Sequence, residues 1–152
     1  MKDCICRNGL ECAACLMKLY DRHAYHNVFV YGTLKSGYKN HRMAFKNRKY
    51  EWLANTTTLP EYGIVYAGTL PFLIKDKLMV HGEVYRINGR FLSALDQLEG
   101  HPHNYKRTMI TLYNDQKAFV YLAGKHITKQ LNKYMDQLVV TDNFDVKEWR
   151  ND

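Results

Sequence analysis

The chain has 152 residues, of which 46% are hydrophobic, and this size suits one domain with a buried core rather than two enzymatic domains. Its formal net charge is +7, and such an excess of basic side chains attracts anions, either a carboxylate substrate or a phosphate backbone. The first residues lack the unbroken apolar stretch of a secretory signal, and no later segment has the length and hydrophobicity of a membrane span. We therefore expect a cytoplasmic protein with no membrane partner.

The N-terminal extension, residues 1–26, contains all the cysteines of the chain: Cys4, Cys6, Cys12 and Cys15. A cytoplasmic chain keeps its thiols reduced, so these residues do not indicate a disulfide framework. Four thiolates, with His23 and His26 as substitute ligands, can bind zinc tetrahedrally. The two pairs are closer together than in a usual zinc ribbon, so both a zinc site and an extension that binds no metal remain open.

The first strand pattern runs from Asn27 to Tyr31 and leads directly into a glycine-containing turn, Gly32-Thr33-Leu34. Glycine permits close approach of a ligand to the backbone, and successive N–H groups in a turn can bind an anion or a developing oxyanion. Most such turns are simple connections, and this one has neither Walker nor Rossmann spacing. The following residues, 35–49, include Lys and Arg but no acid, which indicates a solvated surface or an anion-binding patch.

The later patterns predict mostly strands with one clear helix. Strands are expected at 51–58, 78–87, 105–113 and 117–123, the last two forming a hairpin. Between them, Asn88 can cap a helix with an apolar stripe that Gly100 ends. A weaker helical pattern after Lys125, formed by Ile127, Leu131, Tyr134, Met135 and Leu138, predicts a covering helix. We therefore expect an α+β domain at 27–152, with a core at 27–123 and a C-terminal tail at 124–152.

Two acids, Asp96 and Glu99, lie near the end of the predicted helix. The negative end of the helix dipole disfavours a carboxylate there, so a partly buried Glu99 would have a raised pKa suited to proton exchange near neutrality. On the residues alone, the commoner interpretation is that both acids are exposed charges on the helix surface.

Three other candidates have a structural and a functional interpretation. Glu83 alternates along its strand with Tyr85, so it either faces a polar pocket or is a hydrogen-bonded structural acid. Tyr105 and Tyr121 either line a pocket or belong to the core. His101 and His103 lie near Glu99 but match no signature, and we assign them no catalytic role.

Two motifs together resemble one enzyme family. A strand and loop of the form F-V-Y-G-T-L-K-x-G-x-x-N-H-R extends from Phe29 to Arg42, and an E-x-x-P-x-x-Y-x-R pattern begins at Glu99 and ends at Arg107. In this order they resemble the gamma-glutamylcyclotransferase superfamily, in particular its gamma-glutamylamine cyclotransferase branch. The resemblance covers about residues 27 to 123, and the tail after Lys125 shows no clear counterpart.

The resemblance implies a small, strongly bent mixed sheet or β-barrel with short flanking helices. It implies that Glu99 is the catalytic acid/base. The residues that it assigns to substrate binding are Tyr31, Gly32, Thr33 and Leu34, with Tyr105 and Tyr121 lining the pocket. The implied reaction releases 5-oxoproline from a gamma-glutamyl amine such as gamma-glutamyl-epsilon-lysine, with no cofactor and no metal in the active site.

Two alternatives stay open beside this hypothesis. The first is a cyclotransferase acting on gamma-glutamyl amino acids or on another gamma-glutamyl amide, for which the pocket would be similar. The second is a non-catalytic module that uses the same loop and the basic residues of 35–49 to bind an anionic ligand or nucleic acid. The acid at position 99 argues against the second alternative, and nucleic acid is not the expected partner.

Overall fold

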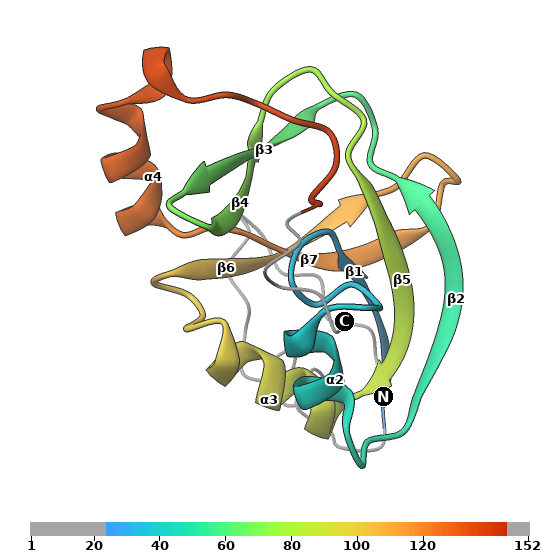
Figure 1. Ribbon diagram of the computed structural model, residues 1–152. Helices are drawn as coiled ribbons and strands as arrows, with labels where there is room; N and C mark the ends of the chain where they lie inside the picture. Colours follow the sequence, from blue (N-terminus) through green and yellow to red (C-terminus); the bar gives the residue numbers. More distant parts are fainter. Residues whose placement is uncertain (1–23, 146–152) are drawn as a thin grey trace, which may run out of the picture.

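The computed structural model describes residues 24–145, which form a mixed sheet with helices packed against it (Figure 1). The sulfur ligands proposed for zinc and His23 lie outside these residues. In chain order the elements are β1 (Tyr25–Val30), α2 (Lys39–Phe45), β2 (Tyr50–Thr57), β3 (Tyr62–Ala67), β4 (Leu70–Lys75), β5 (His81–Asn88), α3 (Gly89–Leu98), β6 (Tyr105–Thr111), β7 (Lys117–Ala123), α4 (Lys125–Asn132) and the 3₁₀ turn η2 (Met135–Gln137).

The sheet has the strand order β2-β5-β1-β7-β4-β3, and β6 pairs with the other edge of β7. Strand β7 is the branch point, because Phe119 pairs in parallel with Val28 of β1 and Leu122 pairs in parallel with Leu73 of β4. Two strands therefore share one edge of β7 and diverge from it, which bends the sheet strongly. The expected α+β class and bent mixed sheet are confirmed.

Strand β1 is central because both of its faces are buried. Phe29 packs in one core cluster with Val84, Val120 and Phe144, whereas Val28 and Val30 pack in a second cluster beneath α3. This alternation follows from the two-residue period of a strand. The end of β1, where the loop begins, is thus held firmly between two cores.

The structure contains three elements that the sequence patterns did not predict: α2, β3 and β4. Helix α2 has no side-chain N-cap hydrogen bond and no acid in its first turn, so the usual start signals are missing. Strand β4 carries Pro71 near its start, a residue that argues against a strand. Gly68, with φ +65°, occupies the tight turn between β3 and β4, where the left-handed region favours glycine.

The C-terminal part is only partly the predicted covering helix. Helix α4 ends at Asn132, and Tyr134, which the helical pattern included, is exposed. After η2 the chain continues without helix or strand over residues 139–145, which we call the C-terminal strap. Thr141 of the strap exchanges backbone hydrogen bonds with Ile64 of β3, at 2.8 and 2.9 Å, and the Phe144 side chain is fully buried.

Candidate active site

Glu99 owes its position to the way helix α3 begins and ends. The Asn88 side chain caps the helix by accepting a hydrogen bond of 2.9 Å from the N–H of Phe91. At the other end, the N–H of Glu99 still donates to Leu95 O, and Gly100 then adopts φ +64° and terminates the helix. Glu99 is therefore the C-cap residue, on a rigid support beside the end of β1.

The Glu99 side chain lines a small hollow that opens to solvent, with about 340 Å³ of empty space including its mouth. The remaining lining comes from the end of β1, the loop after it, and single residues of β4, β6 and β7: Phe29, Val30, Tyr31, Gly32, Thr33, Leu34, Pro71, Tyr105 and Tyr121. We call this the Glu99 hollow. All the residues that the sequence proposed for catalysis and substrate binding thus lie together around one space.

The Glu99 carboxyl group has a pKa near neutrality. Burial raises its pKa from 4.5 to about 7, because removing solvent disfavours the charged form. The sequence argument attributed a raised pKa to the helix dipole acting on a partly buried Glu99, and desolvation by the walls of the hollow is the cause found in the structure. A group of this kind can both accept and return a proton at neutral pH.

Three tyrosines form the walls of the hollow and direct their hydroxyl groups to protein acceptors. Tyr31 donates to Tyr121 O at 2.8 Å, Tyr105 donates to Pro71 O at 2.8 Å, and Tyr121 donates to Asp96 Oδ1 at 2.7 Å. Burial raises the pKa of all three phenols, with the Glu99 charge as a lesser cause. They are therefore neutral near pH 7 and fix the shape of the site.

Asp96 is not the exposed surface charge that the residues alone suggested. Its side chain forms a buried ion pair with Arg107 of β6, and each residue is only 7% exposed. Helix α3 packs its apolar side on β1 and β5, and Arg107 reaches Asp96 from β6. Both groups are buried there, so each charge requires the other. The signal in the sequence was that Asp96 follows Leu92 by four positions and so shares the apolar side of the helix.

The loop that faces Glu99 is held in place by α2. The Asn40 side chain donates to Thr33 Oγ1 at 3.0 Å, and His41 Nδ1 donates to the carbonyl of Leu34 at 2.8 Å.

Close packing of this loop also requires glycine at position 32, where a Cβ would lie 2.8 Å from Pro71 Cγ. Within the described part of the chain, the N–H groups of Gly32, Thr33 and Leu34 donate to no protein acceptor. Sequence reasoning quoted Asn40 and His41 as a motif but gave them no role.

Glu83 lies outside the Glu99 hollow. Its Oε1 atom accepts hydrogen bonds from the N–H of Ser36 at 2.7 Å and from the Tyr85 hydroxyl at 3.0 Å. It also lines two neighbouring surface hollows, so Glu83 is both a hydrogen-bonded structural acid and a residue that faces a pocket.

His101 accepts a hydrogen bond from the N–H of Arg107 at 2.9 Å, a contact that supports the turn after α3.

Residues 24–145 include no helix long and apolar enough to cross a bilayer. They also include no group of three or more His, Cys, Asp or Glu side chains arranged to hold a metal ion.

Comparison with known proteins identifies a family and several similar proteins. The family described as gamma-glutamyl cyclotransferase, AIG2-like, matches residues 28–145. A putative gamma-glutamylcyclotransferase of Methanocaldococcus jannaschii is 31% identical over 126 residues, which cover 81% of this chain and 97% of that protein. A crystal structure of an AIG2-like protein from Mus musculus superposes with a TM-score of 0.70 at 26% identity, over 86% of this chain and 97% of that one.

The chain therefore belongs to the AIG2-like gamma-glutamyl cyclotransferase family. The family match continues past Ala123, where the recognisable motifs end, and includes α4 and the C-terminal strap. Two curated relatives carry a more specific name. Gamma-glutamylaminecyclotransferase B of Danio rerio is 34% identical, over 70% of this chain and 63% of that protein, and the Homo sapiens gamma-glutamylaminecyclotransferase is 39% identical, over 55% of this chain and 59% of that protein.

Proposed function

We propose that the protein is a gamma-glutamylamine cyclotransferase, which converts a gamma-glutamyl amine into 5-oxoproline and the free amine. The observation that supports this proposal most directly is the Glu99 hollow. It contains a carboxyl group with a pKa of about 7 facing a turn of backbone amides. This arrangement supplies proton exchange and oxyanion stabilisation, the two things that lactam formation needs from a protein.

In the proposed reaction the α-amino group of the substrate attacks its own γ-carbonyl carbon. Glu99, unprotonated, accepts a proton from the α-ammonium group, and the freed amine forms the new C–N bond of the five-membered ring. The N–H groups of Gly32, Thr33 and Leu34 stabilise the oxyanion. Collapse breaks the original C–N bond while Glu99 returns its proton to the leaving nitrogen. The second proton that the ring nitrogen loses passes to the released amine, which leaves as an ammonium ion, so the protein ends the cycle in its starting state.

The substrate supplies its own nucleophile, so the protein has mainly to fold it correctly. Well-oriented intramolecular reactions reach effective molarities of about 10⁵ M or more. The tyrosine walls, each fixed by a hydrogen bond to the protein, provide a shaped surface for that folding. No cofactor has a place in this scheme.

The names of the zebrafish and human relatives favour an amine over an amino acid as the released group. The Asn40-His41 pair that holds the loop belongs to the motif that resembles the gamma-glutamylamine branch. Cyclisation of gamma-glutamyl amino acids is the competing hypothesis, because the Glu99 hollow would bind the same glutamyl group.

Product analysis tests this proposal. The protein is incubated with gamma-glutamyl-epsilon-lysine, gamma-glutamyl-alanine and glutathione, and 5-oxoproline is quantified. We expect turnover of the first substrate, and Glu99→Gln should reduce it by about 10²- to 10⁴-fold, the usual contribution of general acid–base catalysis. The exposed residue Glu61 offers a matched control, since Glu61→Gln makes the same change outside the hollow. Near-native turnover by Glu99→Gln, or no 5-oxoproline from any substrate, would contradict the proposal.

A further inference from the structure

A second hollow lies between α2, β2 and β5, and it shares no lining residue with the Glu99 hollow. Four rings and three polar residues line it: His41, Tyr50, Trp52 and Tyr85, with Ser36, Asn55 and Glu83. We call it the aromatic hollow. Its large side chains remain open to solvent, Tyr50 at 47% and Trp52 at 54% exposure.

A β-bulge in β2 creates this arrangement. Trp52 pairs with Tyr85 and Asn55 pairs with Glu83, with the register shift between Trp52 and Ala54. In a regular strand, residues three apart point to opposite faces, but the extra residue places Trp52 and Asn55 on the same face. The indole Nε1–H of Trp52 donates to Asn55 Oδ1 at 3.1 Å, which fixes the two side chains relative to each other.

Tyr50 packs edge to face against Tyr85 and against His41, and these three rings line the hollow together with Trp52. Tyr50 and Tyr85 have ring centroids 5.8 Å apart and planes at 73°, and His41 meets Tyr50 at 84°. Aromatic faces carry negative electrostatic potential, and a group of rings around a common space attracts a cation.

The carboxylate of Glu83 adds a full negative charge to this wall. Its Oε1 atom is fixed by the N–H of Ser36 and the hydroxyl of Tyr85. Its Oε2 atom makes no hydrogen bond within residues 24–145 and keeps its acceptor capacity. The neighbouring Lys35 is directed away to the C-terminal strap, where its Nζ donates to Phe144 O at 2.7 Å and to Asn143 Oδ1 at 3.0 Å.

We propose that the aromatic hollow is a binding site for alkylammonium groups, separate from the site of lactam formation. The aromatic rings provide cation–π attraction for the carbon-bearing surface of such a group, and Glu83 provides the counter-charge. A small metal cation does not fit this chemistry, because the walls offer mainly rings where a hard cation requires several oxygen ligands.

Choline and its neutral isostere 3,3-dimethylbutan-1-ol test the proposal with the full chain. Choline should give saturable shifts of the Trp52 indole N–H resonance in ¹H–¹⁵N spectra, assigned by its loss in Trp52→Phe, while the isostere should give no saturable shift at the same concentrations. By calorimetry, Trp52→Ala and Glu83→Gln should each weaken choline binding by about fivefold or more. Trp52→Phe, which keeps a ring, should weaken it less.

The matched control is Tyr113→Ala, which removes another exposed aromatic ring, 64% exposed, from the β6–β7 hairpin and should leave choline binding unchanged. Thermal melts and the remaining dispersed resonances show whether each variant is folded, and the Glu83→Gln and Trp52→Phe pair covers the case in which Trp52→Ala fails to fold. Equal binding of the two probes, or choline binding unaffected by both Glu83→Gln and the Trp52 variants, would overturn the proposal.

Discussion

Glu99 and Asp96 stand three residues apart near the end of α3, and their surroundings give them opposite effects on stability. Burial raises the pKa of Glu99 from 4.5 to about 7, so the folded state binds its proton more tightly than the unfolded state. The stabilisation from this proton is complete below about pH 4.5 and is lost as the pH rises through about 7. One pKa unit corresponds to about 1.4 kcal/mol, so the charged group costs at most about 3 kcal/mol at pH 8.

We therefore expect Glu99→Gln to raise the free energy of unfolding above pH 7 by up to about 3 kcal/mol, and to raise it progressively less toward pH 4.5. Urea denaturation at pH 5, 6, 7 and 8 measures this dependence. The contrasting variant is Asp96→Asn, an equivalent change on the same helix. It should lower the free energy of unfolding by about 3 to 5 kcal/mol, because it leaves the Arg107 charge buried without its carboxylate. A pH-independent difference for Glu99→Gln would show that its carboxyl group is not desolvated.

The residues of the Glu99 hollow were accessible from the sequence because two short motifs carry nearly all of them. The burial and the interaction partners of those residues could not be predicted from the motifs. Asp96 and Arg107 are 11 positions apart, and only the tertiary fold, which brings Arg107 of β6 within reach of α3, makes a helix acid that would normally be exposed into half of a buried pair. The cause of the Glu99 pKa shift likewise depends on walls from four elements, whereas the helix dipole could be inferred locally.

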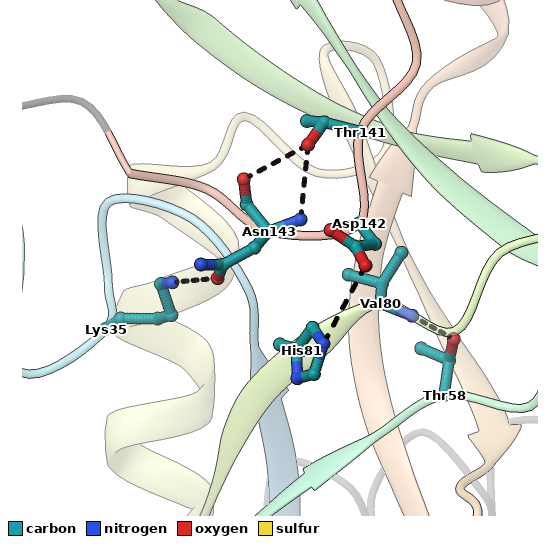
Figure 2. A network of polar contacts seen from close by, with 7 residues as sticks. All are labelled: Lys35, Thr58, Val80, His81, Thr141, Asp142 and Asn143. Carbon is teal, nitrogen blue, oxygen red and sulfur yellow. Dashed lines mark hydrogen bonds and ion pairs between the residues drawn. The ribbon is translucent and has the colours of Figure 1, made fainter.

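At the scale of elements, the C-terminal strap is attached to the loop that follows β1. Figure 2 shows Asn143 of the strap accepting a hydrogen bond from Lys35, and Asp142 paired with His81 at 3.8 Å. The carbonyl of Phe144 accepts from both Lys35 Nζ at 2.7 Å and the Tyr38 hydroxyl at 3.3 Å. The buried Phe144 ring, 5.2 Å from the Tyr38 ring, anchors these contacts.

Phe144→Ala should therefore lower the free energy of unfolding by about 3 to 5 kcal/mol, the usual cost of removing a buried phenylalanine ring. It should also raise the KM for an accepted gamma-glutamyl amine, because Lys35 and Tyr38 lose the fixed carbonyl that restrains the substrate loop. Denaturant titration and steady-state kinetics measure the two effects. Val139→Ala is the control on the same strap, since Val139 is 79% exposed and its truncation should change neither quantity. Native stability of Phe144→Ala would show that the strap is not an anchored part of the fold.

The C-terminal strap is one part of the fold that the sequence did not reveal, because it depends on a distant partner. The strap has little periodicity of its own, and it is defined by the bridge between Thr141 and Ile64 of β3, which lies far away in the chain. The predicted helix after Lys125 was also too long. Its pattern ran through Tyr134 to Leu138, whereas α4 ends at Asn132. By contrast, α3 was predicted well because a capping asparagine, an apolar stripe and a terminating glycine are all local signals.

At the scale of the whole molecule, the net charge of +7 leaves open the alternative that the protein binds an extended anion such as nucleic acid. The structure shows that several basic side chains are already engaged. Lys35 is bound to the C-terminal strap, Arg107 is paired with Asp96, and Arg86 pairs with Glu51 at 3.4 Å. The two arginine pairs already cancel in the net charge, so among these contacts only the engagement of Lys35 by neutral acceptors reduces the net positive charge that is available to a phosphate backbone.

A salt titration distinguishes the two functions. Binding to nucleic acid that neutralises several phosphates weakens by about 10³-fold or more between 50 and 200 mM salt, because condensed counterions are released. Turnover of a small gamma-glutamyl amine in the Glu99 hollow engages single charges at short range, so we expect kcat/KM to change by less than about threefold over the same range. Unrelated 20-nucleotide DNA and RNA, added at up to micromolar concentration in 150 mM salt, should not inhibit 5-oxoproline formation. Tight, steeply salt-dependent binding of these oligonucleotides, together with no turnover of any gamma-glutamyl amide, would instead favour the binding module.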